Sequence, residues 1–255
     1  MNKLLSLIVL LVLLTSCASK ENILYYQNIE NATFNGKQYN PVIKSDDELL
    51  IVVSASNPEA ALPFNLTTIS VPSNEGNLNV AAGQNRIQTY LVDKSGNINF
   101  PQLGVIKMGG LTRTEAVDLL ISKLNNYITN PMVNLRITNF KVTVQGEVAQ
   151  PGVFKIDSER ITLPEAISRA GDLTIYGNRR NVLVIREIDG VKTHKTIDLT
   201  KTDFINSDYY YLTQNDLVVV EPNKTKVNSS AVGANTSVIL STVSLLLTIV
   251  ALILK

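Results

Sequence analysis

Two long apolar runs lie near the ends of the chain, and shorter patterned segments lie between them. The first runs from Leu4 to Leu14, is broken only by Ser6, and follows the basic residue Lys3. A membrane-spanning helix needs roughly 17–25 apolar residues, and this run is shorter. Together with its basic start, it therefore predicts a secretory signal peptide over residues 1–16.

The second run covers residues 236–254 and contains no charged residue. It holds 13 apolar residues and six serines and threonines. A helix of this length would reach about 28 Å, close to the roughly 30 Å of a bilayer's hydrocarbon core. We therefore expect a transmembrane helix over 236–254, preceded by a linker over residues 223–235.

Hydroxyl residues within this run follow a helical spacing. Four of them are separated by four, three and four positions, which places them on one narrow face of a helix. They are Ser237, Ser241, Ser244 and Thr248. Such a stripe packs against a neighbouring helix or faces a water-filled lumen, so we predict a pore or helix interface there. The alternative is a plain tail anchor whose hydroxyls bond carbonyls of their own helix.

Between the ends, a first patterned unit predicts strands around one helix. Residues 43–53 give a turn and a buried strand, and residues 88–100 give a hairpin. Residues 57–85 are rich in Pro and Gly and predict a loop. Thr112 opens a helix through a capping box, and alternating apolar residues over 133–137 predict another strand.

A second unit begins near Asn139. Its pattern predicts a strand over 141–148, a helix opened by a second capping box at Thr162, and a hairpin over 182–199. A turn and a buried strand over 212–220 close this unit.

These patterns predict an α+β fold with two small β-rich domains and a C-terminal membrane helix. The domains cover residues 38–138 and 139–222. Residues 18–37 are Asn-rich and unpatterned. We therefore interpret residues 17–37 as an N-terminal linker.

Composition excludes several classes of site. Lys+Arg 23 against Asp+Glu 22 gives a net charge of +1, which provides no strong field to favour nucleic acid. One Cys and one His exclude an intramolecular disulfide and metal sites with two Cys or two His. Neither a Walker A motif nor a G-x-S-x-G motif occurs. We therefore expect no cofactor, no metal site and no enzymatic activity.

The one cysteine has a specific place. The predicted signal peptide ends Leu14-Thr15-Ser16-Cys17, which resembles the lipobox of bacterial lipoproteins. We therefore predict lipidation of Cys17, whose acyl chains would hold the mature protein on a membrane. An N-terminal anchor helix with an incidental cysteine is the alternative.

Three further features suggest chemistry more weakly. His194 stands between Lys192 and Lys195 in a predicted strand, which favours a solvated face over a catalytic base. Residues 209–211 are three consecutive tyrosines. Their rings could stack on sugars, but packing within the fold is the favoured interpretation. Sequence spacing cannot show the paired carboxylates of a glycan-cleaving enzyme.

The ordered motifs carry a family resemblance. Those of the first domain are Tyr39–Val53, Tyr90–Gly104, Gly110–Ala116 and Tyr127–Val133. Those of the second are Val144–Gly152, Leu163–Gly171, the strand with Arg186, and the turn Asn215-Asp216. The set resembles the outer-membrane polysaccharide export proteins, the Wza-like family, with a polysaccharide export domain followed by an SLBB β-grasp domain.

The chain departs from the family pattern at two turns. The family usually has Gly-Asp where this chain has Asp46-Asp47 and Asn215-Asp216. Asp and Asn tolerate the left-handed backbone conformation better than other non-glycine residues, so we expect both turns to form. Each turn precedes a predicted buried strand, and the two units share this local element.

The resemblance implies a function in transport. Members form ring-shaped homo-oligomers, octamers in known relatives, that let capsular or exopolysaccharide leave the periplasm through the outer membrane. It also implies a periplasmic body, a polysaccharide substrate and an inner-membrane polysaccharide co-polymerase as partner. The rival hypothesis is a non-channel, tail-anchored periplasmic lipoprotein that acts as a glycan-binding or scaffold module.

Overall fold

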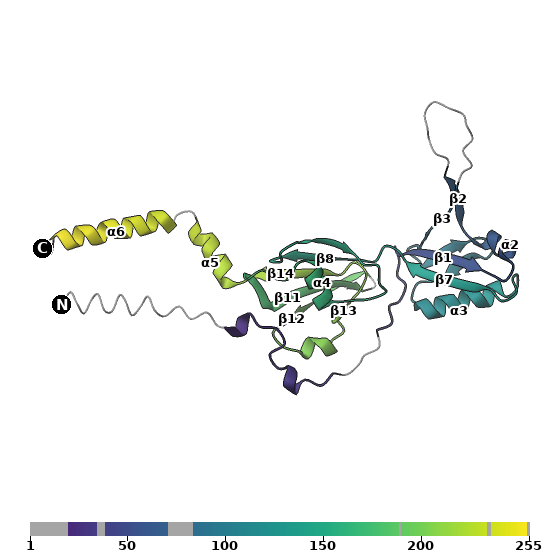
Figure 1. Cartoon of the computed structure of the whole chain (residues 1–255), viewed down its shortest axis with the longest axis horizontal. Helices are drawn as coiled ribbons and strands as arrows, with labels where there is room; N and C mark the ends of the chain where they lie inside the picture. The colour runs from purple at the N-terminus through teal and green to yellow at the C-terminus, as the bar shows by residue number, and fades with distance from the viewer. Residues whose placement is uncertain (1–19, 35–38, 71–83, 189, 234–235, 254–255) are drawn as a thin grey trace, which may run out of the picture.

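The computed structural model describes residues 20–34, 39–70, 84–188, 190–233 and 236–253 (Figure 1). Two separate hydrophobic cores divide most of this chain into two domains that lie end to end. Beyond the second domain, α5 (Lys224–Val232) and α6 (Thr236–Ile253) extend away from the body. The predicted signal peptide lies outside the described residues.

A three-stranded sheet and one helix form the core of the first domain: β1 (Glu48–Ser54), β4 (Tyr90–Leu91), β7 (Met132–Ile137) and α3 (Arg113–Leu124). The strand order is β4-β1-β7, and β1 is antiparallel to both neighbours. The predicted capping box at Thr112 opens α3. Its buried face, including Leu120 and Leu124, packs in the same core as β1.

Two small hairpins and two helical turns complete this domain: α2 (Pro58–Ala61), η3 (Leu62–Phe64), β2 (Thr67–Ser70), β3 (Gln84–Ile87), β5 (Asn97–Phe100) and β6 (Gly104–Lys107). The predicted hairpin over 88–100 is wrong in its pairing. β4 joins the main sheet beside β1, and β5 pairs with β6. Positive φ at Gln102 and Gly104 allows the chain to reverse directly after β5.

A five-stranded sheet forms the second domain: β8 (Lys141–Gly146), β9 (Gly152–Lys155), β11 (Gly177–Ile188), β12 (Val191–Ile197) and β14 (Leu217–Pro222). Its order is β12-β11-β14-β8-β9, with β14 parallel to β8 and the other pairs antiparallel. The predicted hairpin over 182–199 and the predicted capping box at Thr162 are both confirmed.

Smaller elements surround this sheet: β10 (Ile161–Thr162), α4 (Leu163–Arg169), η4 (Asp203–Asn206) and β13 (Tyr211–Leu212). The apolar face of α4 packs in the core of the second domain through Leu163, Ala166 and Ile167. The structure mixes helices and sheets in several small β-rich parts, which agrees with the predicted α+β class.

A similar turn precedes the central strand of each sheet. Asp46 before β1 and Asn215 before β14 both have positive φ, at 67° and 64°, as expected where they replace glycine. The next residues, Asp47 and Asp216, are 1% and 0% exposed. Each carboxylate accepts the backbone N–H three residues earlier at 2.8 Å. The prediction that both turns form is therefore confirmed.

The carboxylate of Asp216 has a buried cationic partner. Arg186 on β11 donates to it from Nε at 3.0 Å and from Nη2 at 2.6 Å. The same guanidinium donates to the carbonyl oxygens of Asp208 and Tyr211 at 2.9 Å and lies over the ring of Tyr209. Because the guanidinium is bonded on several sides, this buried charge is well compensated.

The carboxylate of Asp47 has no such partner. Among the described residues, its Oδ1 makes no hydrogen bond, although its Oδ2 accepts the N–H of Lys44. Burial raises the pKa of Asp47 to about 6, and the N–H of Lys44 offsets only part of that rise.

The two turns meet at the boundary between the domains. The side chain of Asn139 donates to the carbonyl of Asp46 at 2.8 Å and accepts the N–H of Glu48 at 2.9 Å. The carbonyl of Asn139 accepts the side-chain amide of Gln214 at 3.0 Å. One residue between the domains therefore holds the turn of each.

The predicted transmembrane helix over 236–254 is not supported. α6 is present, but it covers 18 residues, and six of those in 236–253 are Ser or Thr. Within the part of the chain that the structure describes, no helix is long and apolar enough to cross a membrane.

We expect Asp216→Asn to destabilise the second domain by about 3–5 kcal/mol, because Arg186 would keep a buried charge without a counter-charge. Urea unfolding of the full-length protein in detergent measures the loss. Glu159→Gln is the control, since it removes the exposed Arg113–Glu159 pair at 2.8 Å and should cost less than about 1 kcal/mol. Equal losses in both variants would contradict the assigned role.

We expect Asp47→Asn to remove a pH dependence of stability. The pKa of Asp47 is about 6 in the folded protein and 3.8 ordinarily, so folding favours the protonated form. That contribution is complete below pH 3.8 and is lost as the pH rises through 6.

The Asp47→Asn variant, which keeps an acceptor for Lys44, should therefore match the wild type near pH 4. At pH 7 it should be more stable by about 1–3 kcal/mol. Urea midpoints between pH 4 and pH 7 measure this difference. A variant that is less stable than the wild type at pH 7 would contradict it.

Candidate functional site

The structure describes three of the five predicted site residues with their side chains. Cys17 and the side chain of Ser237 lie outside what is described. Ser241, Ser244 and Thr248 lie on α6, and all three are exposed. Figure 1 shows α6 projecting beyond α5, away from both domains.

Three described hydroxyls of α6, those of Ser241, Thr242 and Thr248, bond to their own helix. Ser241 Oγ donates to the carbonyl of Val238 at 2.9 Å, and Thr248 Oγ1 donates to the carbonyl of Ser244 at 2.8 Å. This is the geometry that the tail-anchor interpretation expects. A hydroxyl that donates in this way keeps its oxygen lone pairs free to accept a bond from a neighbouring helix.

Large aliphatic side chains cover much of the remaining surface of α6. They are 47–78% exposed and belong to neither hydrophobic core. The residues are Val238, Leu240, Val243, Leu245, Leu246, Leu247, Ile249 and Leu252. A contiguous apolar surface of this kind marks a site of interaction with protein or lipid.

The segment that follows the predicted lipidation site binds the second domain. We call residues 20–34 the N-terminal strap; it contains η1 (Lys20–Asn22) and η2 (Ile29–Asn31). Backbone N–H groups of Tyr26 and Gln27 donate to carbonyls of residues 199–200 at 3.3 and 2.8 Å. Interpreting this segment only as a linker missed these contacts.

Side chains of the strap complete this attachment. Asn28 Oδ1 accepts the N–H and the hydroxyl of Thr202 at 2.8 and 3.0 Å. Tyr25 packs against the core of the second domain and donates its hydroxyl to Asp172 at 2.6 Å. Burial raises the pKa of Tyr25, and the bond to Asp172 adds to the rise. The adjacent aromatic residues Tyr25 and Tyr26 were the sequence signal for this contact.

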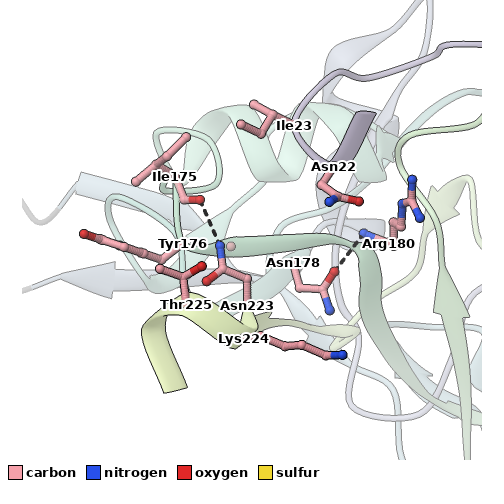
Figure 2. Close-up of a pocket in the computed structure, with 10 residues that line it drawn as sticks. Asn22, Ile23, Ile175, Tyr176, Asn178, Arg180, Asn223, Lys224 and Thr225 are labelled. Carbon is pink, nitrogen blue, oxygen red and sulfur yellow. Dashed lines mark hydrogen bonds between the residues drawn. The ribbon is translucent and has the colours of Figure 1, made fainter. Parts of the chain in front are cut away.

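A cavity of about 560 Å³ lies where the strap approaches the start of α5. Its walls come from the strap, the start of β11 with the preceding loop, and the residues that open α5 (Figure 2). The lining side chains include the cations Arg180 and Lys224 and the amides Asn22, Asn178 and Asn223. Sequence reasoning did not find this cavity, because its walls are far apart in the chain.

The weaker sequence candidates take structural positions. His194 is exposed on β12. The rings of residues 209–211 are half-buried, and Tyr211 stacks on Tyr39 with centroids 4.7 Å apart. This agrees with the packing interpretation. Among the described residues, no group of three or more His, Cys, Asp or Glu side chains could hold a metal ion.

Comparisons with known proteins cover both domains. Residues 35–138 match the family model described as polysaccharide biosynthesis/export protein, and residues 140–220 match the SLBB domain. Two curated relatives are each named EPS I polysaccharide export outer membrane protein EpsA, from Ralstonia solanacearum and Ralstonia nicotianae. They are 31% and 32% identical to this chain over 143 residues, which is 54% of this chain and 37% of each relative.

We expect Asn28→Ala to loosen the strap, because it removes both bonds to Thr202. Backbone amides within residues 20–34 should exchange with solvent up to about thirtyfold faster, consistent with roughly 1 kcal/mol for each of the two lost bonds. Hydrogen–deuterium exchange of the full-length protein measures this rate. Asn31→Ala, at an exposed position of the same segment, is the matched control. Equal acceleration in both variants would contradict the attachment.

Proposed function

We propose that this chain, which belongs to the polysaccharide biosynthesis/export proteins through residues 35–138 and carries an SLBB domain over residues 140–220, is a subunit of an oligomeric outer-membrane channel. The channel exports capsular or exopolysaccharide from the periplasm. The first domain matches a family of polysaccharide biosynthesis/export proteins, and we assign transport rather than catalysis to this chain. The family match alone does not give the closed ring, its position in the outer membrane or its partners, and these are the content of the proposal.

The exposed apolar surface of α6 is the observation that carries this proposal. A helix with eight large aliphatic side chains exposed needs an apolar environment, and the body of the same chain does not provide it. Copies of α6 arranged in a ring would bury part of this surface. The hydroxyl stripe with Ser241, Ser244 and Thr248 would then face the neighbouring helix or the lumen.

The two ends of the described body support an orientation in the periplasm. The start of the strap, η1, and α5 both lie at the end of the second domain that is far from the first domain (Figure 1). Acyl chains on Cys17 would hold this end at the outer membrane. The first domain would then point towards the inner membrane, where a polysaccharide co-polymerase would deliver the polymer.

The rival function is a tail-anchored lipoprotein that acts as a glycan-binding or scaffold module without forming a channel. One observation favours it: the hydroxyls of Ser241 and Thr248 are already bonded within α6. A tail anchor has no need of the stripe, whereas a ring uses it as an interface. Substitutions on and off the stripe therefore separate the two functions.

We expect Ser241→Leu to disrupt the ring and Thr242→Leu to leave it intact. Both hydroxyls donate to the same carbonyl, that of Val238, at 2.9 and 2.5 Å, so the two changes remove equivalent bonds. Only Ser241 lies on the stripe, where a larger side chain would separate closely packed helices.

Native mass spectrometry of the full-length protein in mild detergent measures the copy number, and polymer secreted by cells carrying each variant measures export. The wild type and Thr242→Leu should give one closed assembly, and Ser241→Leu should give smaller species with export reduced about tenfold or more. A monomeric wild type would favour the tail-anchored lipoprotein. Identical behaviour of the two variants would remove the stripe from the interface.

A further inference from the structure

The cavity between the strap and α5 has a rigid polar wall. The side chain of Asn223 donates to the carbonyl of Ile175 at 3.2 Å (Figure 2). The side-chain oxygen of Asn223 accepts the N–H of Lys226 at 3.0 Å. Also in the lining, Asn178 Oδ1 accepts the N–H of Arg180 at 3.2 Å. That bond fixes the amide of Asn178 and leaves its NH₂ group available as a donor.

The charge of the lining is one-sided. Only Arg180 and Lys224 are charged among the ten lining residues, and both are basic. Neither forms a salt bridge with a carboxylate within the described residues. The whole chain, by contrast, is nearly neutral, at 23 basic and 22 acidic residues. Two cations and an amide donor, the kinds of group that bind phosphate oxygens, therefore line this cavity.

Apolar side chains lie beside these cations. Ile23, Ile175 and Tyr176 line the same cavity and are 38%, 58% and 41% exposed. Lys226 Nζ lies 5.1 Å from the centroid of the Tyr176 ring. Cations next to exposed aliphatic and tyrosine side chains suit the membrane interface, where phosphate groups lie directly above the acyl chains. A free anion would make no use of the apolar part.

We propose that this cavity binds the phosphate group of a glycerophospholipid headgroup, with Arg180 and Lys224 on the phosphate and Ile23 and Ile175 against the start of the acyl chains. The inference rests on the proposed outer-membrane location. The site lies where the described chain passes into α5, so a bound lipid would hold this end of the second domain at the membrane surface independently of α6 and of Cys17.

Binding of soluble probes to the full-length protein in neutral detergent tests the site. The probes are short-chain phosphatidylglycerol, inorganic phosphate and a glucuronic acid oligosaccharide, each titrated by calorimetry. The double variant Arg180→Gln and Lys224→Gln should weaken phosphatidylglycerol binding about tenfold or more, because it removes both charged donors to the phosphate. The matched control is Lys192→Gln with Lys195→Gln, which removes the same charge from exposed positions on β12 and should bind within about twofold of the wild type.

Four results would overturn the proposal. Inorganic phosphate that binds as tightly as the lipid would make this a free-anion site. Tighter binding of the acidic oligosaccharide would make it a contact for polymer. Absent lipid binding by the wild type, or equal losses in both double variants, would remove the site altogether. The thermal unfolding midpoint of each variant shows that it is folded before titration.

Native mass spectrometry of the same samples keeps this result separate from the proposed function. A wild-type ring that binds no lipid removes the lipid site and leaves the channel standing. A monomer that binds lipid through Arg180 and Lys224 keeps the site and argues against the channel.

Discussion

Each domain is built outward from a turn with a buried aspartate, and Asn139 holds the two turns against each other. Asp47 and Asp216 each accept a backbone N–H at 2.8 Å, which fixes the turn that starts the central strand of its sheet. Because Asn139 bonds both to the first turn and to Gln214 of the second, the direction of one sheet sets that of the other. The remaining strands pair outward from these two central strands, so the end-to-end arrangement of the body depends on this junction.

The two aspartates differ in how their charge is met. Asp216 pairs with Arg186, whose guanidinium also donates to the carbonyls of Asp208 and Tyr211. The buried ion pair therefore joins β11, β13 and the turn that precedes β14. Asp47 has only a backbone donor and carries a raised pKa. Buried polar groups of this kind contribute more to fixing one conformation than to net stability. In this chain they fix the turn geometry twice, once with a counter-charge and once without.

Local signals in the sequence predicted local structure well. The capping boxes at Thr112 and Thr162 open helices, and Asp46 and Asn215 take the left-handed conformation, because each depends on residues within one turn. The sequence did not predict strand pairing or the attachment of the strap where these depend on segments far apart in the chain. β4 pairs with β1 rather than β5, and the strap is held by residues 199–202, far along the chain. The cavity beside α5 combines three such segments. The hydroxyl stripe on α6 was predicted from the spacing of its residues. Its contact partner was not, because the sequence of one chain does not identify a partner in another molecule or another copy of the chain.

The start of the strap and α5 leave the second domain at the same end, and this has a mechanical consequence. A body tethered to a surface at one point can swing and spin about it. A second tether nearby stops the spin and leaves one axis of rocking, the line that joins the two. With its strap and α6 both held, a subunit could tilt its first domain only towards or away from that line. In a ring, every subunit would have the same single axis of tilt. The first domains, at the end of the ring away from the tethers, could then move outward or inward together, with little rotation about the ring axis.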